Sequence, residues 1–157
     1  MKKMFLMGRS EAGKTSLIQA MRGEALHYVK TQYTNTDADT IDTPGEYAES
    51  KWFSVGLACF SFEADVIALV QAADEPFNLF GSNLQSCIQR PLIGVITKTD
   101  SCYANLPMVR QWMVNSGCER IFEVNNVTRD GIDELLAYLK EDLPRLSLEE
   151  AKDLQHR

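Results

Sequence analysis

Residues 8–15 read Gly8-Arg9-Ser10-Glu11-Ala12-Gly13-Lys14-Thr15, which matches every fixed position of the phosphate-binding pattern G-x-x-x-x-G-K-[ST]. In such a P-loop the glycines let the backbone wrap around a phosphate, and successive backbone N–H groups point at it. The lysine adds a positive charge at the β- and γ-phosphates, and the last hydroxyl can coordinate Mg²⁺. We therefore predict that the phosphates are held by Gly8, Arg9, Ser10, Glu11, Ala12, Gly13, Lys14, Thr15 and Ser16.

The elements around this loop are those that the motif requires. An apolar strand is predicted over 3–7, and an amphipathic helix over 14–22 ends at Gly23. Further along the chain, short apolar runs alternate with helical patterns, which is typical of a parallel sheet covered by helices. The remaining strands are predicted at 40–42, 65–72, 92–96 and 121–124, and the remaining helices at 52–61, 82–89, 106–116 and 132–142. The fold class is therefore α/β: a three-layer P-loop NTPase domain with a mostly parallel sheet flanked by helices.

Composition limits the partners. The chain has 157 residues, enough for one domain, which we place at 1–143, with 144–157 as a tail or short amphipathic helix. The formal net charge of -6 and the lack of a Lys/Arg cluster argue against nucleic acid. No apolar stretch approaches membrane-spanning length. The four cysteines are widely spaced and indicate reduced thiols, so we expect a cytoplasmic protein with no membrane partner.

A second motif, Asp42-Thr43-Pro44-Gly45, follows the predicted strand at 40–42. An aspartate at this place in a P-loop protein holds Mg²⁺, commonly through a water, so Asp42 joins Thr15 as a candidate metal ligand. The N–H of Gly45 is predicted to approach the γ-phosphate. By itself D-x-x-G is a common turn, and its position after a P-loop gives it this interpretation.

A third motif, Thr97-Lys98-Thr99-Asp100, follows the apolar run at 92–96 and so lies at the sheet edge where ligands bind. A carboxylate at Asp100 can accept hydrogen bonds from N1–H and the 2-amino group of guanine, a donor pair that adenine lacks. The stem of Lys98 can lie over the base. The alternative is an ordinary solvated turn. The motif predicts a site for GTP or GDP, with ATP as the alternative nucleotide.

The three motifs together resemble the small GTPases of the translation-factor type. The form DTPGEY at 42–47, with Lys30-Thr31-Gln32 upstream, resembles the EutP/PduV family of ethanolamine and propanediol utilisation over nearly the whole chain. The resemblance implies a small GTPase-like domain with a shortened switch I region, a cytoplasmic location linked to bacterial microcompartments, and shell or pathway proteins as partners.

In this class one threonine of the first switch completes the Mg²⁺ shell. Thr31 is our candidate metal ligand, with Thr34 as the alternative; the other possibility is that the segment 27–40 only connects elements.

The sequence also departs from the GTPase pattern. Glu46 stands where Ras-like proteins carry a water-positioning glutamine, so we expect slow unassisted hydrolysis with Lys14 and Glu46 as catalytic candidates. Glu11 replaces the asparagine of potassium-activated relatives. Asn125-Asn126-Val127 replaces the usual Ser-Ala-Lys, which alters the contact to the edge of the base.

Three functions are compatible with these motifs. The first is a slow GTPase switch using Mg²⁺. The second is a P-loop kinase that transfers phosphate from ATP to a small metabolite such as acetate, placed by Glu46 or Glu11. The third is a non-catalytic module that docks on a microcompartment shell.

Overall fold

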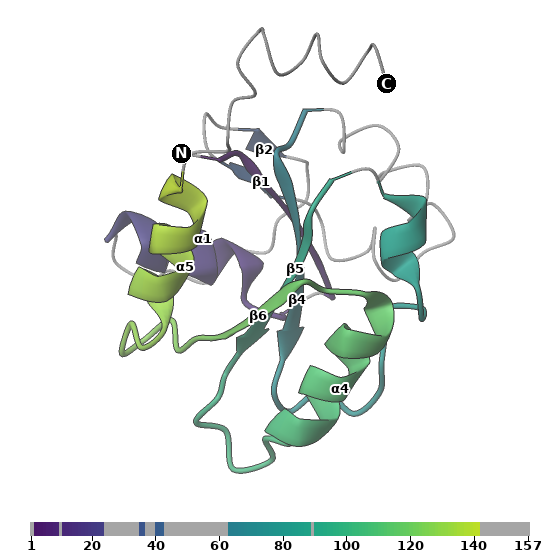
Figure 1. The fold of residues 1–157 in the computed structure, drawn as a ribbon. Coiled ribbons are helices and arrows are strands. Elements are labelled where there is room, and N and C mark those ends of the chain that lie inside the picture. The colour runs from purple at the N-terminus through teal and green to yellow at the C-terminus, as the bar shows by residue number, and fades with distance from the viewer. Residues whose placement is uncertain are drawn as a thin grey trace, which may run out of the picture.

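A six-stranded sheet forms the centre of the computed structural model, which describes residues 2–9, 11–23, 35–36, 40–42, 63–88 and 90–141 (Figure 1). The strand order is β2-β3-β1-β4-β5-β6. All neighbouring strands are parallel except β2 and β3, which pair antiparallel. The strands are β1 (Met4–Gly8), β2 (Asn35–Thr36), β3 (Thr40–Asp42), β4 (Val66–Ala72), β5 (Leu92–Thr97) and β6 (Arg120–Glu123). The mostly parallel sheet predicted from the sequence is confirmed.

Helices cover both faces of this sheet and make three layers. The helices α1 (Lys14–Arg22) and α5 (Ile132–Lys140) lie on one side, and α4 (Leu106–Ser116) with the short 3₁₀ helix η1 (Leu84–Cys87) lies on the other (Figure 1). The central strand β1 shows how the chain achieves this. Met4 and Leu6 pack into the cluster with α1 and α5, whereas Phe5 and Met7 pack into the opposite cluster, because successive side chains point to opposite faces. Every residue of β1, β4 and β5 is buried, as near-continuous apolar runs predict.

Two helix ends follow the sequence signals. Gly23 and Gly117 adopt left-handed conformations (φ 71° and 94°) after α1 and α4, and their amides bond back to the last helical carbonyls. Asn105 caps the start of α4 by accepting a hydrogen bond from the Met108 N–H at 3.2 Å. The guanidinium of Arg129 donates to the carbonyl of Ala20 in the last turn of α1. The predicted bounds of both helices are therefore confirmed.

Other predicted elements need correction. The helix expected at 82–89 is only the 3₁₀ turn η1, because Asn83 before it has a positive φ of 57° and Ile88 after it is extended and buried. The bounds of β1, β4, β5 and β6 each differ from the predicted ranges by one residue. Helix α5 ends at Lys140, two residues early, where Glu141 turns to ψ 127°. The predicted helix at 52–61 and the tail at 144–157 lie outside the described residues.

In the part of the chain that the structure describes, no helix has both the length and the apolar character needed to cross a lipid bilayer.

Candidate nucleotide-binding site

The predicted motifs follow the carboxyl ends of parallel strands, which meet at one edge of the sheet. Strand β1 lies between β3 and β4, with Leu6 beside Asp42 and Gly8 beside Val70 in the register. The P-loop leaves β1 at this edge, and the loops after β5 and β6 leave it two and three strands away. Ligands of open α/β sheets bind outside this edge, so the topology places the phosphate and base motifs around one site.

The P-loop backbone explains the two fixed glycines. A Cβ on Gly8 would lie 2.4 Å from the carbonyl oxygen of Val70, so only glycine permits this approach of β1 to β4. Gly13 has φ 93° at the start of α1, in the region that glycine favours. Glu11 is also left-handed (φ 66°), and the Ala12 N–H closes a turn to the Arg9 carbonyl at 3.1 Å. The loop therefore wraps on itself as phosphate binding requires.

Lys14 lies against this loop rather than in solvent. Its side chain is buried, and its Nζ donates to the carbonyls of Gly8 at 2.8 Å and Arg9 at 3.1 Å. These bonds span the start of the loop and hold the ammonium close to the site that the loop amides surround. The first turn of α1 has no acidic residue and no side-chain cap, which leaves a positive helix end for an anion.

Thr15 and Asp42 are brought together as the sequence predicted. The Thr15 hydroxyl donates to Oδ2 of Asp42 at 2.7 Å, and Asp42 is 4% exposed at the end of β3. A hydroxyl and one carboxylate, completed by phosphate oxygens and water, form the oxygen donor set that Mg²⁺ prefers. The described residues contain no cluster of three or more His, Cys, Asp or Glu that could hold a metal. The Thr15 hydroxyl and the Asp42 carboxylate fit a metal that takes its other ligands from a nucleotide and water.

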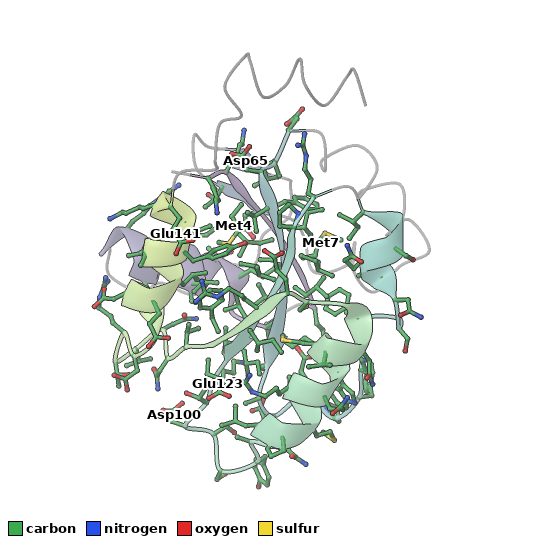
Figure 2. The ribbon with its side chains drawn as sticks, in the orientation of Figure 1. Met4, Met7, Asp65, Asp100, Glu123 and Glu141 are labelled. Atoms are coloured by element: carbon green, nitrogen blue, oxygen red, sulfur yellow. The ribbon has the colours of Figure 1, made fainter. Side chains whose placement is uncertain are left out.

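The loop after β5 carries the predicted base contact. Lys98 has a positive φ of 53°, and the Ser101 N–H bonds to its carbonyl at 3.1 Å, which forms a tight turn. Asp100 is exposed on this turn beyond the end of β5 (Figure 2). The Thr97 hydroxyl at the strand end is fully buried and donates to the carbonyl of Ala12 in the P-loop. The loop after β5 and the P-loop are therefore directly bonded.

The loop after β6 adds two residues whose roles sequence reasoning did not specify. Oδ1 of the buried Asn125 accepts from the N–H groups of Val127 at 2.9 Å and Thr128 at 3.1 Å. This turn leaves the Asn126 N–H without an acceptor among the described residues, so it can serve a ligand. The Asn126 side chain donates through Nδ2 to the Gly13 carbonyl at 3.3 Å. The two asparagines were noted in the sequence only as a departure, because a single chain does not reveal which side-chain bonds they make.

A polar group beside the P-loop was also missed. The Arg9 guanidinium carbon lies 4.8 Å from the centre of the Phe77 ring, and the charge of Arg9 acts on the nearby Glu75. Glu75 is buried and accepts from the Ala72 N–H at 3.1 Å, and burial raises the pKa of its carboxyl. The available signal was the Asp-Glu-Pro run directly after an apolar strand at the ligand edge.

Several predicted site residues lie outside the described part of the chain: Ser10, Thr31, the alternative Thr34, Gly45 and Glu46. Among the others, Glu11 is exposed and Ser16 is half-buried in the first turn of α1. The described residues that converge are those of the P-loop with Asp42, tied to the loops after β5 and β6.

Fold and loop together define an α/β protein of the P-loop nucleotide-binding class. Residues 1–141 match the PduV–EutP family, described as ethanolamine utilisation and propanediol utilisation. The chain belongs to this family.

Curated relatives agree with that assignment. The chain is 42% identical over 140 residues to the propanediol utilization protein PduV of Citrobacter freundii, covering 88% of this chain and 93% of the relative. It is 30% identical over 143 residues to the probable acetate kinase EutP of Escherichia coli strain K12, covering 88% and 89%.

Solved structures show the same fold. The Arl6 BBS3 small GTPase of Trypanosoma brucei, bound to the nucleotide analogue GppNp, matches 88% of this chain and 95% of its own with a TM-score of 0.66 at 16% identity. The RocCORdC part of Methanosarcina barkeri Roco2, bound to GDP, matches with a TM-score of 0.57 at 21% identity; the match covers 88% of this chain but only 47% of that one.

Proposed function

We propose that this chain binds guanine nucleotides with Mg²⁺ and acts as a slow GTPase switch in ethanolamine or propanediol utilisation. The observation that carries the proposal is the 2.7 Å contact between the Thr15 hydroxyl and Asp42, directly after the buried Lys14. A hydroxyl, a carboxylate and an ammonium at a glycine-containing P-loop match the needs of a metal-bound triphosphate.

Lys14 stabilises negative charge on the transferring phosphoryl group, because its ammonium is fixed by two loop carbonyls and needs little rearrangement. Thr15 and Asp42, with Thr31 from the first switch, would hold Mg²⁺, and the metal would supply positive charge at the phosphates. Gly45 contacts the γ-phosphate, and Glu46 places the attacking water. A carboxylate does this poorly beside a phosphate, so hydrolysis is slow without a partner.

The base lies between the loops after β5 and β6. Asp100 accepts from N1–H and the 2-amino group, the Lys98 stem covers the ring, and the Asn126 N–H donates to the 6-oxygen. Adenine carries an amino group at that last position and lacks the donor pair for Asp100, which gives the preference for guanine.

A titration with GTP, GDP, ATP and ADP in the presence of Mg²⁺ tests the proposal, followed by measurement of phosphate release. Tight guanine-nucleotide binding with slow release of inorganic phosphate supports it. Lys14→Ala abolishes binding, whereas Lys140→Ala, a control at an exposed lysine of α5, leaves it unchanged. ATP binding as tight as GTP binding contradicts the role of Asp100.

A P-loop kinase acting on a small carboxylic acid such as acetate is the second candidate. Relatives named probable acetate kinase favour it, as does the Arg9 guanidinium, a group that binds carboxylates. In that reaction the γ-phosphoryl group of ATP passes to a carboxylate oxygen, giving an acyl phosphate and ADP. Hydroxylamine trapping of the acyl phosphate, with ATP and acetate present, distinguishes the kinase from hydrolysis to inorganic phosphate.

The family suggests a cytoplasmic location beside a microcompartment, with shell or pathway proteins as partners. If docking is independent of nucleotide, Lys14→Ala keeps the protein at the compartment. If docking follows the switch, the same variant is dispersed. Fluorescence imaging of the tagged full chain separates the two.

A further inference from the structure

Two consecutive carbonyls of the P-loop are held by side chains from distant parts of the sequence. The Thr97 hydroxyl, at the end of β5, donates to the carbonyl of Ala12, and Nδ2 of Asn126 donates to that of Gly13 at 3.3 Å. The Gly13 carbonyl also accepts the first helical bond of α1, from Leu17 N at 2.8 Å, and so uses both lone pairs. Because carbonyls bonded to the protein fix the peptide planes, these bonds help to turn the loop amides toward a phosphate.

The fit at this junction is close. A Cβ built on Gly13 would lie 3.2 Å from Nδ2 of Asn126 and 3.5 Å from the Thr97 hydroxyl oxygen. The orientation of the Asn126 amide is fixed by chemistry, since Gly13 offers only an acceptor and therefore requires the NH₂ group. Oδ1 of Asn126 is buried with no hydrogen-bond partner in the described part of the chain.

Asn126 also has a second, separate donor. Its backbone N–H has no acceptor among the described residues, because the Asn125 side chain takes the next two amides of the turn. One residue therefore carries a backbone donor with no acceptor among the described residues and a side chain bonded to the P-loop.

We propose that Asn126 is a positioning residue that couples occupation of the base site to the geometry of the P-loop. A base bound to the Asn126 N–H fixes the loop after β6, and the side chain passes this restraint to the Gly13 carbonyl. The proposal rests on the proposed base site. As a consequence, binding of the base half of a nucleotide increases the affinity for the phosphate half, and the reverse, even when the two halves are separate molecules.

The test uses the two halves as separate ligands on the full chain: guanosine for the base site, and pyrophosphate with Mg²⁺ for the P-loop. In the wild type, saturating guanosine tightens pyrophosphate binding by about fivefold, the lower end of typical coupling. Asn126→Ala keeps the backbone N–H and removes the side-chain bond to the Gly13 carbonyl. The affinity for guanosine should therefore stay the same, whereas guanosine should no longer tighten pyrophosphate binding. Val127→Ala, a neighbouring change at a side chain 77% exposed, keeps the full effect.

Asn126→Asp provides a second variant of the same size, whose carboxylate cannot donate to Gly13; it should lose the coupling too. Thermal unfolding checks that each variant is folded. If the wild type prefers guanosine but the tightening survives in both variants, the coupling role of Asn126 is wrong while the base site stands. If the wild type does not prefer guanosine to adenosine, the proposed base site fails and the coupling fails with it.

Discussion

Asp100→Asn is the sharpest perturbation of the proposed base site. Asp100 is exposed, and no described residue holds its carboxylate by a hydrogen bond. Its turn is fixed by other groups: the Ser101 N–H bonds to the Lys98 carbonyl at 3.1 Å, and the Ser101 hydroxyl donates to Asp74 at 3.0 Å. The substitution therefore changes the chemistry presented to a ligand without removing a contact of the fold.

The size of the effect follows from the hydrogen bonds lost. A carboxylate accepts both guanine donors, and hydrogen bonds to charged groups contribute about 1.5–3 kcal/mol each. Asparagine accepts one and points an N–H at the other, so Asp100→Asn should weaken GTP binding by about 2–4 kcal/mol, or about 30- to 1000-fold. Xanthosine triphosphate, with an oxygen in place of the 2-amino group, should bind the variant better than GTP does. ATP binding should change by no more than about twofold.

Displacement of a fluorescent nucleotide measures all three affinities. Asp130→Asn is the matched control, because it removes the same charge from an exposed residue in the loop after β6. If Asp100→Asn binds GTP as tightly as the control does, or if its ATP affinity falls in parallel with GTP, the base assignment is wrong.

Three further predictions concern the metal, a buried acid and the core. Asp42→Asn keeps an acceptor for the Thr15 hydroxyl but loses the negative charge that attracts Mg²⁺. Mg²⁺ should therefore increase GTP affinity at least about tenfold less in the variant than in the wild type. Titrations with Mg²⁺ and with EDTA measure this increase. Glu75 has a pKa raised by burial, so the folded state holds its proton more tightly than the unfolded chain. The free energy of unfolding should therefore decrease as pH rises above about 4.5, the ordinary value, and urea unfolding of Glu75→Gln should lack this contribution. Gly94→Ala would place a Cβ 2.3 Å from Sδ of the buried Met113, and should lower the free energy of unfolding by about 1–3 kcal/mol in the same assay; an unchanged value would show that Met113 moves aside freely.

The sequence predicts the fold well where periodicity and end signals agree. The bounds of α1 and α4 follow from an apolar pattern closed by Gly23 and Gly117. The segment 82–89 also has apolar spacing, but burial of Ile88 in extended form stops the helix, and that burial is a tertiary effect. A local sequence pattern does not show where the neighbouring strands lie, and their packing decides whether such a segment forms a helix.

The candidate site also has residues that the sequence could predict and contacts that it could not. Lys14, Thr15 and Asp42 could be predicted because the P-loop and the aspartate motif have recognisable patterns, and the structure places Asp42 in contact with Thr15, next to Lys14. The hydrogen bond from Asn126 to Gly13 joins residues 113 positions apart, and only the order of β1, β4, β5 and β6 makes them neighbours. A bond of this kind has no local sequence signal.

The loop after β6 holds α1 at both ends: Asn126 bonds to Gly13 where the helix starts, and Arg129 bonds to Ala20 in its last turn. Bonds at both ends of this nine-residue helix oppose its movement along its own axis. If the chain is the switch proposed above, the loss of a terminal phosphate should therefore change the position of the segment that follows Asp42 and leave α1 in place.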